Sequence, residues 1–181
     1  MATLYTIGHS NRSLHDFLEI LIAHNITDLI DVRSIPKSRN VPWFNKNMLE
    51  KALRKINIHY EHLPELGGLR HAKKDSENMG WRNTSFRGFA DYMQTQVFFA
   101  GLKKLNTLLK KPNRVAIMCA EAVPWRCHRS LIADAETIRH IRVLDIFSKT
   151  TIHRHVLTSF AVVNRKKRPM RIIYRNSKNQ S

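Results

Sequence analysis

Arg114-Val-Ala-Ile-Met-Cys-Ala-Glu-Ala-Val-Pro-Trp-Arg-Cys-His-Arg129 runs from an apolar segment, through a loop that contains Pro124, into a helical pattern. The apolar residues before Cys119 predict a buried strand, and the pattern from Cys127 to His140 predicts a helix. A buried strand that passes through a loop into a helix is the unit from which parallel sheets are built. The segment therefore predicts an α/β protein.

The same alternation of strands and helices extends in both directions along the chain. Further strands are expected at 4–7, 28–32, 58–63 and 142–146, and an edge strand is considered at 170–174. The residues from Phe86 to Leu109 read as one long helix, with a break near Gly101 left open. This spacing predicts a mainly parallel sheet with helices on both faces, a three-layer αβα, Rossmann-like fold.

Length and charge divide the chain into two parts. Its 181 residues suit one domain, which we place at residues 1–161, followed by a basic C-terminal extension at 162–181. The formal net charge is +17, and the residues from Ile146 to Ser181 include nine basic and no acidic side chains. Such a charge attracts polyanions, but it equally suits a solubilising tail. Charge alone leaves both alternatives open.

The sequence also indicates a compartment. No segment approaches the roughly 20 apolar residues of a membrane-spanning helix, and the N-terminus lacks the pattern of a signal peptide. Two cysteines in a chain of this length are not a disulfide framework. We therefore expect a cytoplasmic protein without a membrane partner. The sequence does not indicate an oligomeric state.

Polar residues follow three of the expected strands. His9 and Ser10 come after the first strand, Asp31 and Arg33 after the second, and Cys119 and Glu121 after the fourth. In open parallel sheets, ligands bind beyond the carboxyl ends of the strands. These six residues are therefore the candidates for a shared pocket.

Cys119 is the candidate nucleophile or redox centre. A cysteine beside a helix N-terminus and several arginines lies in a positive field, which favours the thiolate and also binds phosphate. Cysteine phosphatases and rhodaneses use a similar strand–loop–helix cradle, although their arginine follows the cysteine one position sooner than Arg126 does here. The alternative is a buried, inert cysteine.

The remaining candidates surround Cys119. An anion is expected to be held by Ser10 and three arginines, with Asp31 orienting one guanidinium, and the alternative is an ordinary ion-pair network. The arginines are Arg33, Arg126 and Arg129. His9 or Glu121 is expected to move protons.

Cys127 and His128 are assigned supporting places. Cys127 is expected to face the core from the first helical turn, whereas His128 either points to solvent or caps the site. A metal site formed by His9, Cys119, Glu121 and His128 has no local ligand spacing in its favour. The sequence therefore predicts no metal and no cofactor.

Two loop segments alternate basic and aromatic residues. They are Leu66-Gly-Gly-Leu-Arg70 and Gly80-Trp-Arg-Asn-Thr-Ser-Phe-Arg-Gly88. With Trp43, Phe44 and Trp125, they either offer stacking surfaces for bases or line the core beneath a long loop.

Five motifs in order carry a family resemblance. They are Tyr5-Thr-Ile-Gly-His-Ser-Asn-Arg12, Asp31-Val-Arg33, Leu63-Pro-Glu-Leu-Gly-Gly68, Gly80-Trp-Arg-Asn83 and the segment 118–129. From about residue 3 to about residue 174, the chain resembles the domain-of-unknown-function family 488. The resemblance implies a compact α/β domain without an established general activity, whose members are associated with nucleic acid or DNA repair. It marks as recurrent His9, Ser10, Asp31, Arg33, Glu65, Cys119, Glu121, Cys127, His128, Arg129 and His155.

Two functions follow as hypotheses. The first is an enzyme that acts on a phosphate-bearing substrate, such as a nucleotide or nucleic acid, through the Cys/Glu/Arg/His pocket. The second is a non-catalytic nucleic-acid-binding module in which the basic tail makes the contacts and Cys119 is structural. Thiol reactivity separates them, because only the first requires a thiolate at Cys119.

Overall fold

A six-stranded sheet forms the centre of the protein in the computed structural model, which describes residues 2–176. The strand order is β3-β2-β4-β1-β5-β6, and only β6 runs antiparallel to its neighbour. The strands are β1 (Thr3–Gly8), β2 (Asp28–Asp31), β3 (His59–His62), β4 (Val115–Cys119), β5 (Arg142–Ile146) and β6 (Ile152–Arg154). The predicted mainly parallel sheet is confirmed.

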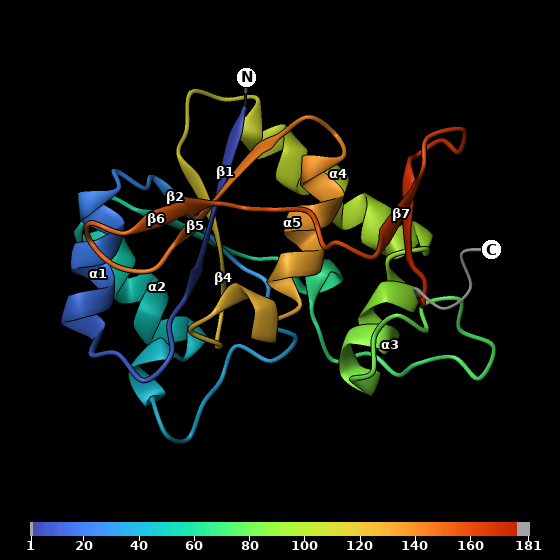
Figure 1. The fold of residues 1–181 in the computed structure, drawn as a ribbon. Helices are drawn as coiled ribbons and strands as arrows, with labels where there is room; N and C mark the ends of the chain where they lie inside the picture. The colour runs from blue at the N-terminus through green and yellow to red at the C-terminus, as the bar shows by residue number, and fades with distance from the viewer. Residues whose placement is uncertain (1, 177–181) are drawn as a thin grey trace.

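Helices cover both faces of this sheet, as Figure 1 shows. Residues of α1 and α2 pack into one apolar cluster, and residues of α3, α4 and α5 pack into the other. The helices are α1 (Leu14–Ala23), α2 (Lys46–Lys55), α3 (Thr84–Tyr92), α4 (Gln96–Leu109) and α5 (Arg129–Thr137). This is the expected three-layer αβα arrangement.

Strand β4 shows why the layers form. Val115 and Ile117 pack into the cluster on one face, whereas Ala116 and Met118 pack into the cluster on the other. Successive side chains of a strand point to opposite faces, so a continuous apolar run is buried on both sides only when helices cover both.

The single long helix expected from Phe86 to Leu109 is wrong. Two helices occupy the region, and the break lies between Tyr92 and Gln96 and not at Gly101. Thr95 starts the second helix because its side chain accepts a hydrogen bond from the backbone N–H of Phe98. The sequence prediction missed this cap because Met93 and Val97, four residues apart, keep a helical spacing of apolar residues on either side of it.

The C-terminal region forms a hairpin of its own. Strands β7 (Ala161–Asn164) and β8 (Arg171–Tyr174) pair antiparallel in a separate two-stranded sheet. A strand does form within 170–174, but it pairs with β7 and does not extend the edge of the main sheet. Figure 1 shows the hairpin beside the layer of α3, α4 and α5, on the side away from α1 and α2. The boundary at residue 161 stays a prediction, and 177–181 lie outside the described residues.

Asp134 in α5 anchors the hairpin to the domain. Its buried carboxylate accepts hydrogen bonds from the Tyr174 hydroxyl at 2.8 Å and from the Thr158 backbone N–H at 3.1 Å. His155 Nε2 lies 2.8 Å from the same carboxylate, and His155 Nδ1 lies 3.4 Å from Asp145. These contacts give His155 a structural role.

Within residues 2–176, no helix has the length and apolar character needed to cross a membrane.

Candidate functional site

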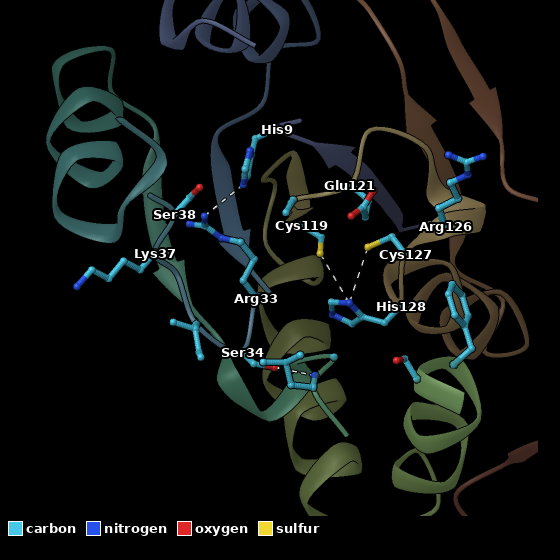
Figure 2. Close-up of a pocket in the computed structure, with 16 residues that line it drawn as sticks. His9, Arg33, Ser34, Lys37, Ser38, Cys119, Glu121, Arg126, Cys127 and His128 are labelled. Carbon is cyan, nitrogen blue, oxygen red and sulfur yellow. Dashed lines mark hydrogen bonds between the residues drawn. The ribbon is translucent and has the colours of Figure 1, made fainter. Parts of the chain in front are cut away.

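A pocket of about 430 Å³ opens at the carboxyl ends of β1, β2 and β4. Seven of the residues expected to form a site line it, and Figure 2 shows them around one cavity. They are His9, Arg33, Cys119, Glu121, Arg126, Cys127 and His128. The structure therefore brings together groups from three separate strand ends, as the topology predicts.

Cys119, Cys127 and His128 form a tight cluster in the pocket lining. The Nδ1 atom of His128 lies 3.7 Å from the sulfur of Cys119 and 3.8 Å from the sulfur of Cys127. All three atoms lie within 4.8 Å of one another. Cys127 thus belongs to the site itself, whereas its sequence position predicts only a supporting place in the core.

The two thiols have opposite tendencies to ionise. A hydrogen bond from the Cys127 thiol is the largest of the effects that hold the pKa of Cys119 well below its usual range. Interactions with the imidazole of His128 and the charge of Arg129 add to it, against the effect of burial. Burial, together with the nearby Cys119, holds the pKa of Cys127 well above its usual range. Of the two thiols, Cys119 is therefore the one that ionises more readily.

Several contacts fix the imidazole of His128. Its Nε2 lies 3.0 Å from the carbonyl oxygen of Val32, so in the neutral ring Nε2 carries the proton and Nδ1 presents its lone pair to the sulfurs. Phe89 packs edge-on against the ring at 4.9 Å. Gly68 lies so close to the ring that an added Cβ would lie 2.4 Å from Nδ1. The Gly-Gly motif thus allows the loop to close over His128.

Arg33 and His9 form a second, largely satisfied unit. Asp31 accepts hydrogen bonds from Nε and Nη2 of Arg33, and Phe44 accepts another through its carbonyl oxygen. His9 Nδ1 lies 2.7 Å from the carbonyl oxygen of Ser10, which leaves Nε2 to accept from Arg33 Nη1 at 3.3 Å. Burial is the main cause that lowers the pKa of His9. The ring is therefore neutral and its lone pair is already in use.

Two predicted anion ligands lie outside the pocket lining. Arg129 is 1% exposed, and its guanidinium donates to Thr6 Oγ1 and to the carbonyl oxygens of Glu121 and Ala122. Ser10 uses its backbone N–H to donate to the carbonyl oxygen of Ala120 at 2.7 Å. Both residues hold the 119–122 loop in place, and we assign them a positioning role.

The rim of the pocket carries its charged side chains. Glu121 is the only acidic residue of the lining among the described residues, and Figure 2 draws its carboxylate on the side where the sulfurs lie. Lys37 and Arg126 line opposite sides of the mouth with exposed side chains. Figure 2 shows the Arg126 guanidinium directed away from the sulfurs, unlike the arginine of a phosphatase cradle that faces its cysteine.

Sequence reasoning missed a second group of lining residues. It comprises Ser34, Ile35, Lys37, Ser38, Gly68, Leu69, Ser85 and Phe86. Residues 34–38 come shortly after β2. The rule that ligands bind beyond the carboxyl ends of parallel strands, which predicts Arg33 at the site, could therefore have predicted them as well. Ser85 and Phe86 begin helix α3, and no feature of the sequence places that helix beside the strand ends.

The aromatic residues expected either to stack on bases or to line the core differ in their exposure. Trp81 packs against Phe86, Phe160 and Tyr174 at centroid distances of 4.8 to 5.4 Å, as core lining beneath the loop. Phe44 is buried under His9, whereas the Trp125 side chain is 64% exposed.

The fold and the pocket together define a three-layer α/β protein with a thiol–imidazole site at the carboxyl edge of its parallel sheet. The chain belongs to the family described as domain of unknown function DUF488, which it matches over residues 13–135. That range contains the whole segment from Cys119 to Arg129. Neither the curated proteins nor the solved structures contain a match to the chain.

Iodoacetamide is expected to modify Cys119 at pH 6 at least about tenfold faster than it modifies free cysteine, whose thiol has a pKa of about 8.5. Cys127 should react only after unfolding, because burial raises its pKa. Peptide mapping by mass spectrometry over time, on reduced and chelator-treated protein, measures both rates. If Cys119 remains unmodified until denaturant is added, its sulfur is structural.

Proposed function

We propose that this protein is an enzyme that acts on a phosphate-bearing substrate, such as a nucleotide or nucleic acid, with Cys119 and Glu121 as its catalytic groups. The observation that carries the proposal is the position of the Cys119 sulfur. It lies in the lining of a substrate-sized pocket, its pKa is lowered, and a carboxylate shares the lining.

Charge supports the choice of an anionic substrate. Asp31 neutralises Arg33 within the protein, which leaves the cationic side chains of Lys37 and Arg126 at the mouth of the pocket, while Glu121 and the Cys119 sulfur are its acidic groups. Neither Lys37 nor Arg126 forms an ion pair with another described residue. The backbone N–H groups of Glu121 and Ala122 likewise have no acceptor within residues 2–176, and Glu121 lines the pocket, so we propose its N–H as a donor to an oxyanion.

Glu121 is the better candidate for proton transfer. The lone pair of His9 is occupied by Arg33, whereas the exposed carboxylate of Glu121 has no hydrogen-bond partner in the described part of the chain. We further propose a cytoplasmic setting, because a catalytic thiol at Cys119 must stay reduced.

The test is turnover on a panel of phosphate esters. We expect the full-length protein to hydrolyse at least one of p-nitrophenyl phosphate, bis(p-nitrophenyl) phosphate and a 5′-phosphorylated single-stranded oligonucleotide. Both Cys119→Ser and Glu121→Gln should remain folded. Glu121→Gln should lose roughly 10²- to 10⁴-fold in rate, the usual contribution of a positioned acid or base. Cys119→Ser should lose most of the turnover, because it removes the nucleophile.

Glu50→Gln on α2 is the matched control for the loss of one carboxylate. Glu50 pairs with Arg54 on an exposed helix face and lies outside the pocket lining. The turnover rate of the Glu50→Gln variant should therefore equal that of the natural protein. Full turnover in both pocket variants, or none by the natural protein on the whole panel, contradicts the proposal.

A second function, nucleic-acid binding, is favoured by the hairpin tip. Residues 165–168 read Arg-Lys-Lys-Arg, are exposed, and lie between β7 and β8. No acidic residue pairs with them in the part of the chain that the structure describes. A basic two-stranded ribbon of this kind suits contact with a phosphate backbone.

Replacing all four tip residues with glutamine is expected to weaken oligonucleotide binding strongly. The slope of log K against log salt should shrink by about 0.7–0.9 for each phosphate that the tip no longer neutralises. Substitution is preferable to deletion, because Tyr174 in β8 is buried against Asp134. Fluorescence anisotropy across a salt series gives both quantities.

The control removes the same charge from helix α2. It replaces Lys46, Lys51, Arg54 and Lys55, all exposed, with glutamine. Equal losses of affinity in the two variants would show that net charge, and not the hairpin, drives binding.

A further inference from the structure

Three possible metal-ligand atoms lie close together in the lining of the pocket. They are the sulfurs of Cys119 and Cys127 and the Nδ1 atom of His128, with S–N separations of 3.7 and 3.8 Å. Tetrahedral Zn²⁺ with Zn–S bonds of about 2.3 Å and Zn–N bonds of about 2.0–2.1 Å places a sulfur and a nitrogen roughly 3.6 Å apart. Both S–N separations match this value, and the two sulfurs lie within 4.8 Å of each other.

The surroundings of His128 also suit a ligand. Metal-binding histidines usually donate their second ring N–H to a carbonyl or carboxylate, which fixes the tautomer and the ring orientation. The carbonyl oxygen of Val32 accepts this hydrogen bond at 3.0 Å, while Gly68 and Phe89 hold the ring from its sides. Nδ1 is thereby directed to the sulfurs before any ion arrives.

The nature of the ligands selects the ion. Two thiolates and one imidazole are soft to borderline donors, which favour Zn²⁺ and related transition metals over Mg²⁺ or Ca²⁺. Two thiolates also balance the charge of a divalent ion. All three residues line the open pocket, so a fourth coordination position faces the cavity that Glu121 shares. Three protein ligands with an open position are typical of catalytic zinc sites.

We infer that Cys119, Cys127 and His128 bind one divalent transition-metal ion, Zn²⁺ by preference, with its open position toward the pocket. This inference differs from the expectation of a site without a metal. Its ligand set also differs from the disfavoured set of His9, Cys119, Glu121 and His128, because Cys127 takes the place of His9 and Glu121. The inference deepens the proposed function and rests on it for the role of the ion. Bound metal would make the Cys119 sulfur a ligand and supply the pocket with a Lewis acid and an activated water.

Metal binding is measured on the full-length protein without any substrate. Reduced, chelator-stripped protein is titrated with Zn²⁺ in competition with a chromophoric chelator, and separately with Co²⁺. We expect one equivalent of each ion to bind. The Co²⁺ complex should show thiolate-to-metal charge transfer and the intense visible bands of a tetrahedral site. Zn²⁺ should also protect Cys119 from iodoacetamide.

Variants of the pocket separate ligands from neighbours. Cys127→Ser, Cys119→Ser and His128→Gln should each weaken Zn²⁺ binding by more than about 100-fold, since loss of even an outer partner costs 10–100-fold. His9 and Glu121 line the same pocket, and the variants His9→Gln and Glu121→Gln should bind Zn²⁺ with nearly natural affinity. Circular dichroism confirms that each variant is folded.

The inference is overturned by any of three results. They are failure of the natural protein to bind either ion, a Co²⁺ spectrum without thiolate charge transfer, and one-equivalent binding that survives Cys127→Ser. Its failure is distinguishable from that of the proposed function. If protein that binds neither ion turns over substrate and this turnover requires Cys119 and Glu121, the enzyme proposal holds and the metal inference fails. Metal binding in a protein without turnover would leave only the metal site.

Discussion

Asp134→Ala is expected to lower the free energy of unfolding by about 3–5 kcal/mol, the usual cost of removing one partner from a buried ion pair. Asp134 is fully buried and contacts His155, the Thr158 backbone and the Tyr174 hydroxyl. Its loss leaves the imidazolium of His155 with Asp145 alone and releases β8 from α5. Urea denaturation followed by circular dichroism measures the change.

The pH dependence of this effect identifies its source. Burial alone would lower the pKa of His155, but hydrogen bonds with Asp134 and Asp145 outweigh it and raise the pKa from 6.5 to about 9. Because the folded-state pKa is raised, protonated His155 contributes its full stabilisation below about pH 6.5. This contribution is lost as the pH rises through about 9. The difference between the natural protein and Asp134→Ala should therefore shrink between pH 6.5 and pH 9.5.

Asp75→Ala provides the comparison for Asp134→Ala. Asp75 is exposed in a loop and forms no ion pair with a described residue, so its removal should change stability by less than about 0.5 kcal/mol. A pH-independent loss in Asp134→Ala would contradict the assignment to the ion pair with His155.

Arg129→Met is expected to destabilise the protein by about 2–4 kcal/mol, because hydrogen bonds to a charged group contribute about 1.5–3 kcal/mol each. The substitution leaves the carbonyl oxygens of Glu121 and Ala122 without their donor. It also removes a positive charge that lowers the pKa of Cys119. We therefore expect slower alkylation of Cys119 at pH 6 together with the loss of stability.

Arg126→Met is the matched control on the same loop. Arg126 is exposed, and Figure 2 shows its guanidinium directed away from the sulfurs, so stability and the alkylation rate should change little. Equal effects of the two substitutions would mean that loss of charge, and not the hydrogen bonds of Arg129, is responsible. The pair thus tests whether Arg129 positions the loop.

Packing of Gly8 explains why the loop after β4 lies so close to β1. A Cβ at this position would lie 1.7 Å from the carbonyl oxygen of Glu121, so only glycine allows the two loops to touch. The close approach brings the carbonyl oxygen of Glu121 within reach of the Arg129 guanidinium. The arrangement of the site therefore depends on a glycine that carries no chemistry itself.

The sequence by itself determined the layered α/β fold and the edge at which the pocket lies. Apolar runs such as Val115–Met118 must be buried on both faces, and parallel strands bring residues that follow them, such as Arg33 and Cys119, to one edge. These properties depend on local patterns that short windows of sequence contain.

Only the tertiary structure decided which neighbours those residues have. The Val32 carbonyl selects the tautomer of His128, and Gly68 and Phe89 hold the ring against two sulfurs. The tertiary structure also directs the Arg129 guanidinium to the carbonyl oxygen of Glu121 and places Cys127 in the pocket lining. Distances of a few ångströms between residues far apart in the chain follow from helix packing and loop closure, and no spacing along the sequence records them.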